Sequence, residues 1–135
     1  MPEPRRQYST RTKYEFQFGY SRAVRQGNVI RVAGTAGLAE NGQVVSDDVV
    51  DQARRALEIV REAIEKLGGT LDDVIMTRIF VSDTQNIDRV AVIHGEVFRE
   101  IRPATSIVKV GFIDPKIQVE IEAEAIMGGK LESES

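Results

Sequence analysis

The sequence contains no cysteine, no tryptophan and a single histidine among its 135 residues. Without cysteine it has no disulfide framework, no thiolate nucleophile and no cysteine-ligated zinc or iron–sulfur site. A Ser-His-Asp triad or a metal site with several histidines would depend on His94 alone. We therefore expect no metal and no cofactor, and any catalysis must use carboxylates, hydroxyls, backbone groups and water.

Long apolar runs and an excess of positive charge are also missing. No apolar run approaches the roughly 20 residues that a membrane-spanning helix needs, and no apolar segment of a secretory signal follows the basic N-terminus. The 18 basic and 21 acidic side chains give a net charge of -3, which argues against a general nucleic-acid binder. We expect a cytoplasmic protein whose partner is a small molecule rather than a membrane or a nucleic acid.

The length fits one domain, because domains commonly have roughly 100–150 residues. No internal repeat or low-complexity linker divides the chain. We expect residues 1–13 to form a flexible N-terminal arm, residues 14–127 a single domain, and residues 128–135 a flexible tail.

Hydrophobic periodicity predicts the elements of this domain. Apolar residues at i, i+3 and i+4 spacing predict a long helix over residues 48–67, capped by Ser46, and a shorter helix over residues 87–99. Alternation of apolar and polar residues over 14–18 indicates a short strand with one buried face. The main strands are expected over residues 23–25, 29–33, 74–81, 105–110 and 117–125. The order β-β-α-β-α-β-β indicates an α+β domain with two helices on one face of a single mixed sheet.

The predicted strand over residues 74–81 is apolar on both faces. One face carries Ile75, Ile79 and Val81, and the other carries Val74, Met76 and Phe80. Two helices can cover only one face of the sheet, and a strand that is buried on both faces needs a second cover. Because a large exposed apolar surface indicates an interface, we predict an obligate oligomer built through the second face.

Three glutamates alternate along the last predicted strand: Glu120, Glu122 and Glu124. Alternate residues of a strand lie roughly 6.5–7 Å apart, so these carboxylates share one face. A solvated face is the common reason for this pattern, whereas catalysis requires one carboxylate to be partly buried with a shifted pKa. The sequence alone does not show which of the three glutamates would be catalytic.

His94 lies in the middle of the shorter predicted helix. A lone histidine on a helix is usually a surface or boundary residue.

Two motifs near the C-terminus are distinctive: Arg-Pro-Ala-Thr-Ser-Ile-Val-Lys-Val at residues 102–110 and Ile-Gln-Val-Glu-Ile-Glu-Ala at residues 117–123. Together with upstream features, they resemble the signature of the RidA/YjgF family of reactive-intermediate deaminases. The upstream features are Tyr20, the Gly27-Asn28 turn, Val32-Ala33-Gly34, Gln52-Ala53-Arg54 and Ile79-Phe80-Val81. The resemblance covers roughly residues 18–127. It implies a chorismate-mutase-like subunit, a homotrimer, and small-molecule clefts between neighbouring subunits.

The resemblance also implies a set of site residues. Glu120 and a bound water would serve proton transfer and hydrolysis of a C=N bond without a metal. Tyr20, Ala33 and Gly34 would lie around the substrate.

Several implied positions depart from the family pattern. Ala33, Ala91 and Ile107 stand where the family commonly has serine, asparagine and cysteine, and the substrate anchor differs as well. Deaminating members carry an arginine that holds the substrate carboxylate, and the corresponding residue here is Thr105. A neutral hydroxyl cannot donate the two parallel charge-assisted hydrogen bonds of a guanidinium. Either Arg102 or Arg78 replaces this anchor, or the chain belongs to an arginine-lacking branch whose ligand is not a 2-imino acid. We favour the second explanation.

Three functions follow from these observations. The first is a deaminase or hydrolase that acts on small imines or enamines in the intersubunit cleft. The second is a non-catalytic trimer that binds a small metabolite in the same cleft. The third is the endoribonuclease or translation-inhibitor activity attributed to some relatives. It ranks last, because a chain of net charge -3 with one histidine lacks both a basic groove and the usual acid–base pair for RNA cleavage.

Overall fold

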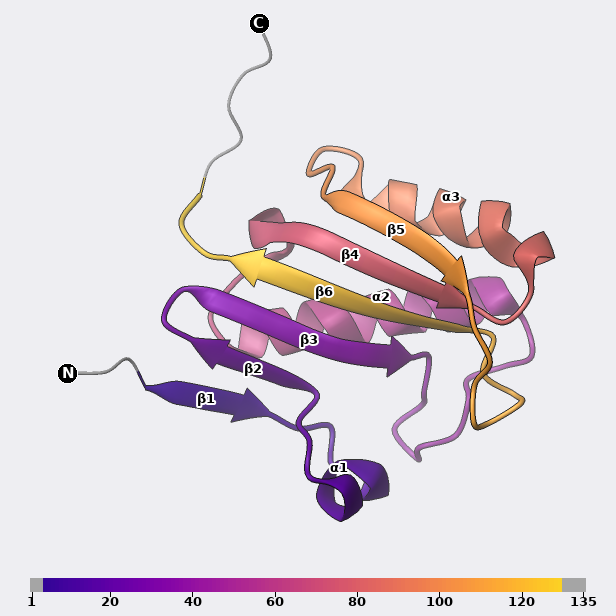
Figure 1. Ribbon diagram of the computed structural model, residues 1–135, viewed down its shortest axis with the longest axis horizontal. Helices are drawn as coiled ribbons and strands as arrows, with labels where there is room; N and C mark the ends of the chain where they lie inside the picture. The colour runs from indigo at the N-terminus through magenta and orange to yellow at the C-terminus, as the bar shows by residue number, and fades with distance from the viewer. Residues whose placement is uncertain (1–3, 130–135) are drawn as a thin grey trace, which may run out of the picture.

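The computed structural model describes residues 4–129 as six strands in one sheet, with the spatial order β1-β2-β3-β6-β4-β5 (Figure 1). The strands are β1 (Arg5–Tyr8), β2 (Ala23–Gln26), β3 (Val29–Ala36), β4 (Val74–Val81), β5 (Ala104–Lys109) and β6 (Val119–Ile126). Strands β4 and β5 are parallel, and all the other neighbours are antiparallel. The predicted α+β fold with a mixed sheet is confirmed.

Helices α2 (Val49–Lys66) and α3 (Ile87–Phe98) cover one face of the sheet, behind the strands in Figure 1. The cap of α2 is Asp48, whose carboxylate accepts the Val50 N–H at 2.8 Å, and not Ser46 as predicted. Ser46 instead accepts the Asp48 N–H at 3.0 Å. Short 3-10 turns, η1 (Leu71–Asp73) and η2 (Thr84–Asn86), precede β4 and α3. None of the helices within residues 4–129 has the length and hydrophobicity to cross a membrane.

The core lies between this face of the sheet and the two helices. The inward side chains of β6 are fully buried: Val119, Ile121, Ala123 and Ala125. The intervening glutamates remain partly exposed on the opposite face. Burial of an aliphatic side chain contributes roughly 1.5–3 kcal/mol, so this alternation fixes which face of β6 carries the carboxylates.

The segment predicted as a strand over residues 14–18 is a helix, α1 (Lys13–Phe18). Thr12 caps it, and the Glu15 carboxylate in turn accepts the Thr12 N–H at 3.3 Å. A capping box of this kind stabilises a helical first turn, and it outweighs the alternating aromatic pattern. The expected buried aromatic face is therefore wrong: Phe16 is 75% exposed and Phe18 is 66% exposed.

Part of the predicted flexible arm is also ordered by pairing. Residues 5–8 form β1, whose partner is β2 with Arg5 opposite Gln26. Residues 1–3 of the predicted arm and residues 130–135 of the predicted tail lie outside the described residues. The division of the chain after residues 13 and 127 stays a prediction.

Strand β4 departs from the predicted alternation at its start. A register shift between Val74 and Met76 turns Val74 into the core and leaves Ile75 48% exposed. The assignment of Ile75 to the face of Ile79 and Val81 is therefore wrong, and so is the assignment of Val74 to the face of Met76 and Phe80. Met76 and Phe80 do lie partly buried on the face opposite the helices, which we call the open face.

Candidate active site

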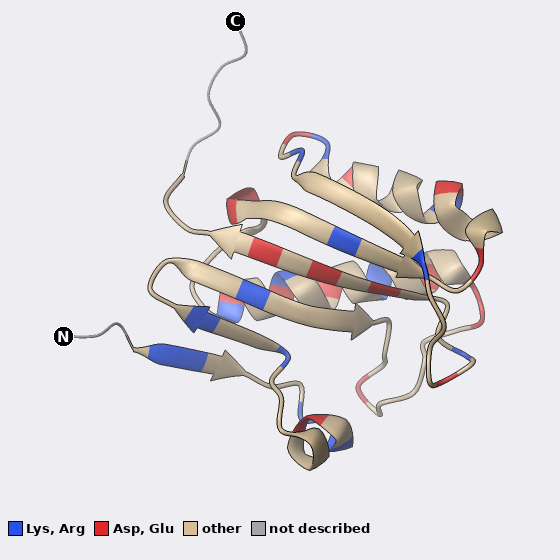
Figure 2. Ribbon diagram, viewed as in Figure 1, with Lys and Arg blue, Asp and Glu red and all other residues tan. Residues whose placement is uncertain are grey.

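The open face carries a row of carboxylates along β6 between single cations on β3 and β4 (Figure 2). Arg78 of β4 pairs with Glu122 at 3.6 Å and with Glu124 at 3.4 Å. Arg31 of β3 reaches Glu124 at 3.7 Å. Glu122 and Glu124 thus belong to a partly exposed ion-pair network. Arg78 lies opposite Glu122 rather than Glu120, so its role as a substitute anchor stays a prediction.

Glu120 has different surroundings, because it lies across the backbone of Gly34. A Cβ atom at residue 34 would be 2.8 Å from Glu120 Oε1. Only glycine leaves the space for this carboxylate to rest against the β3 backbone. Strand β3 is irregular here, with a register shift between Val32 and Thr35, and bulges of this kind commonly redirect groups next to functional sites.

The structure adds Arg22, which the sequence analysis did not identify. Arg22 is 7% exposed. Its Nη1 donates to the Gly34 carbonyl at 2.5 Å and to Thr35 Oγ1 at 3.1 Å. The Tyr20 ring lies against the guanidinium, with 5.8 Å between Arg22 Cζ and the ring centroid. Arg22 therefore holds the irregular stretch of β3 and brings a positive charge toward Glu120.

These neighbours shift the acidity of Glu120. Burial of the carboxylate raises its pKa and is the largest effect, the Arg22 charge opposes this rise, and the Glu122 charge adds to it. The net result is a pKa above the ordinary glutamate value of 4.5. A partly buried carboxylate with a raised pKa is suited to accept a proton and return it during one reaction cycle.

The predicted residues Tyr20, Gly34 and Glu120 are thus brought together in one chain. Tyr20 follows α1 through Gly19 and is 42% exposed, so its ring forms an outer wall of the group. Ala33 lies beside Gly34 in β3, and its N–H donates to the Arg22 carbonyl at 2.9 Å. We call Tyr20, Arg22, Gly34 and Glu120 the Glu120 site.

Thr105 does not reach the Glu120 site within one chain. It lies on β5, two strands from β6, and its hydroxyl is directed to the helix side of the sheet. Its Oγ1 is 2.8 Å from Thr77 Oγ1, which is 2.8 Å from His94 Nε2. Thr105 Oγ1 also donates to the Pro103 carbonyl at 3.1 Å.

The proton positions in this chain of hydrogen bonds follow from its last acceptor. In the arrangement in which Thr105 donates its single proton to the Pro103 carbonyl, Thr77 donates to Thr105. Thr77 then has no second proton, and His94 donates from Nε2 in this arrangement. His94 is consequently a partner of a fully buried threonine rather than a simple surface residue.

The second predicted substitute, Arg102, lies in the turn between α3 and β5. It has a φ of 55°, a left-handed conformation that is uncommon for a residue with a side chain. Its backbone N–H donates to the Phe98 carbonyl at 2.8 Å, which closes the end of α3. This position follows from the helix end, and a role for Arg102 in binding stays a prediction.

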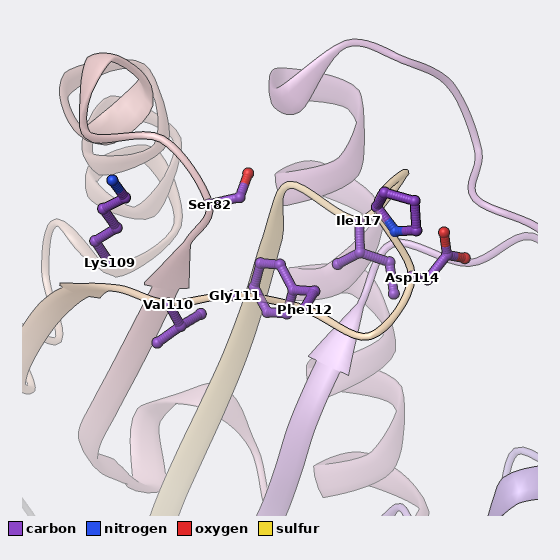
Figure 3. A pocket seen from close by; sticks show the side chains of 8 residues that line it. Ser82, Lys109, Val110, Gly111, Phe112, Asp114 and Ile117 are labelled. Carbon is purple, nitrogen blue, oxygen red and sulfur yellow. The ribbon is translucent and has the colours of Figure 1, made fainter.

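A separate cavity of about 580 Å³ lies where β4 and β5 end and β6 begins (Figure 3). Ser82, Phe112 and Ile117 lie around it, with Lys109 at one margin and Asp114 at another. The Glu120 site does not line this cavity. Within residues 4–129, no group of three or more potential acidic or histidine ligands could hold a metal ion.

Comparison with known proteins agrees with this arrangement. A family model described as Endoribonuclease L-PSP matches residues 11–127. The crystal structure of Rv2704 from Mycobacterium tuberculosis, a member of the YjgF/YER057c/UK114 family, is 41% identical, with a TM-score of 0.85 over 92% of this chain and 100% of that chain. A RutC family protein of Pyrococcus abyssi is 31% identical over 78% of this chain and 84% of its own length. The 3-aminoacrylate deaminase RutC of Acinetobacter baylyi is 34% identical over 78% of this chain and 85% of its own length.

Proposed function

The chain belongs to the Endoribonuclease L-PSP family, the RidA/YjgF family, and we propose that it hydrolyses the carbon–nitrogen double bond of a small imine metabolite, including an imine formed from an enamine. The observation that carries the proposal is the Glu120 carboxylate, partly buried across Gly34 and with a raised pKa. A relative that is 34% identical is named a 3-aminoacrylate deaminase, which supports this class of reaction.

The proposed step balances with water as the only co-reactant. Glu120 accepts a proton from a water molecule as the water oxygen bonds to the imine carbon, and it returns this proton to the imine nitrogen. The resulting aminoalcohol transfers its hydroxyl proton to the nitrogen, and the C–N bond breaks to give ammonia and a carbonyl product. An enamine enters the same path after tautomerisation, in which its carbon gains a proton and its nitrogen loses one.

The site would lie in a cleft between subunits of a homotrimer. Support comes from the open face, where the partly buried Met76 and Phe80 lie beside the exposed Val108 of β5. Thr105 faces away from Glu120 within one chain, so only a neighbouring subunit could bring residue 105 to the ligand. Sedimentation analysis should give about 45 kDa, three times the 15.0 kDa chain, and a stable 15.0 kDa species would contradict the cleft.

A second candidate function is binding of the same class of metabolite without turnover. It is favoured by Thr105, whose hydroxyl is engaged by Thr77 and Pro103 and carries no charge. Generating 2-iminobutanoate or 3-aminoacrylate in situ separates the two functions. Hydrolysis predicts faster release of ammonia when the protein is added. Unchanged release with both compounds would eliminate the proposed reaction and leave binding alone.

A further inference from the structure

Arg22 carries the positive charge that acts on Glu120 from the same site. An arginine that is only 7% exposed is costly to bury, and the contacts around its guanidinium explain how the charge is held. Nη1 makes both of its recorded hydrogen bonds within β3, to the Gly34 carbonyl and to Thr35 Oγ1. Tyr20 lies against the guanidinium face at 5.8 Å, within the range of a cation–π contact.

These contacts leave one edge of the guanidinium unused. Within residues 4–129, Nε and Nη2 of Arg22 donate to no acceptor. The fully buried side-chain atom without a hydrogen-bond partner in this part of the chain is Glu15 Oε1, and so Nε and Nη2 of Arg22 are not fully buried. Both nitrogens therefore retain some access to the surface. Nε and Nη2 lie on the same edge of the guanidinium, which is an edge that can donate two parallel hydrogen bonds to a carboxylate.

Glu120 does not occupy this edge. The described residues contain no ion pair between Arg22 and Glu120, although the Arg22 charge lowers the Glu120 pKa against the effect of burial. The two groups are joined through Gly34, whose carbonyl accepts from Arg22 and whose missing Cβ leaves the space for Glu120. A small ligand can thus face a cation and a proton acceptor that do not neutralise each other.

We propose that Arg22 anchors the anionic end of the ligand, so that the Glu120 site selects small carboxylates although residue 105 is threonine. This inference rests on the proposed function, because it assigns a substrate class to the same site. It differs from the sequence-based alternatives, since Arg78 is engaged by Glu122 and Glu124.

Binding of product analogues tests the inference without requiring turnover. Calorimetry compares 2-oxobutanoate with its uncharged methyl ester on the wild-type protein and on Arg22→Gln. The matched control is Arg25→Gln. Arg25 lies in β2 and, like Arg22, donates to backbone carbonyls, which are those of Gly27 at 2.9 Å and Leu67 at 2.7 Å. We expect Arg22→Gln to weaken 2-oxobutanoate binding by about tenfold or more and Arg25→Gln to leave it within about twofold. Binding of the ester should stay unchanged in both variants.

Other results would overturn the inference. Equal affinity of the wild-type protein for the acid and the ester, or binding of neither, contradicts it, and so does an Arg22→Gln variant that binds 2-oxobutanoate as tightly as the wild type. If Arg22→Gln does not fold, Arg22→Lys keeps the charge but lacks the planar edge, and it should still lose about threefold or more. Imine hydrolysis with no preference for carboxylates would support the proposed function and contradict the role of Arg22 as an anchor. Carboxylate-selective binding that depends on Arg22, without hydrolysis, would support the anchor and contradict the proposed function.

Discussion

Glu120 and Gly34 are in such close contact that a Cβ at residue 34 would lie 2.8 Å from Glu120 Oε1. The group that would have to move is the end of a side chain rather than backbone. Gly34→Ala should therefore displace the Glu120 carboxylate while the fold is kept. We expect deamination to fall by about tenfold or more, because small displacements of a catalytic group are costly. The thermal midpoint should change little.

The control for this substitution is Gly95→Ala in α3, where an added Cβ has no atom within 4 Å. Alanine is favoured over glycine inside a helix by up to about 1 kcal/mol, so this variant should be slightly more stable and fully active. Equal rates for Gly34→Ala and Gly95→Ala would show that the contact between Gly34 and Glu120 does not matter for the reaction.

The pKa of Glu120 should respond in opposite directions to its two charged neighbours. Glu122→Gln removes a negative charge and should lower the pKa of Glu120, whereas Arg22→Gln removes a positive charge and should raise it. Titration of the carboxyl carbons by NMR follows both shifts. A pKa that moves the same way in both variants would contradict the described electrostatics.

The raised pKa of Glu120 also has a consequence for stability. Burial favours the protonated form in the folded state, so the stabilising contribution of Glu120 is complete below about pH 4.5 and is lost as the pH rises through the raised pKa. Glu120→Gln should therefore be more stable than the wild type near pH 7, and this advantage should disappear near pH 4. Denaturant unfolding at equal protein concentration measures the difference. A Glu120→Gln variant that is less stable near pH 7 would contradict the account.

The single histidine makes the Thr105–Thr77–His94 chain directly observable by nitrogen NMR. We expect a neutral ring protonated on Nε2. Burial lowers the pKa of His94 from its ordinary value of 6.5, so the stability that depends on His94 is present above about pH 6.5 and is lost as the pH falls below it.

Thr77→Val tests the same chain by removing the buried hydroxyl. It should destabilise the protein by about 1–3 kcal/mol, because the His94 Nε2–H loses its acceptor. Thr105→Val removes the acceptor of the Thr77 hydroxyl, but residue 105 is exposed and water can replace that acceptor, so the cost should be less than about 1 kcal/mol. An Nδ1-protonated ring in the wild type, or equal costs for the two substitutions, would show that the assigned direction of the hydrogen bonds is wrong.

Much of the fold could be predicted because periodicity reports burial. The strand at residues 74–81 has the predicted bounds, and the helix predicted over 48–67 is observed over Val49–Lys66. The failure at residues 14–18 has a local cause. The alternating aromatic residues indicated a strand, but the capping box of Thr12 and Glu15 begins a helix there. The spacing of these two residues is visible in the sequence and could have been recognised as a capping box.

The site was only partly predictable for a different reason. Tyr20, Gly34 and Glu120 could be named from a resemblance in sequence, but nothing local marks Arg22 as buried. Its burial depends on the irregular stretch of β3 that exposes the Gly34 carbonyl, and on β6, which brings Glu120 from the far end of the chain. Such contacts arise from register between distant strands, which periodicity does not report.

The central claim is that Glu120 transfers the protons during hydrolysis of a C=N bond. The most direct test is the release of 2-oxobutanoate from 2-iminobutanoate generated in situ, with wild-type protein and with Glu120→Gln at equal concentrations. Glutamine keeps the shape of the side chain but cannot accept the proton of water, so the account predicts acceleration by the wild type and a loss of about a hundredfold or more in the variant. Equal acceleration by the two proteins would contradict the account.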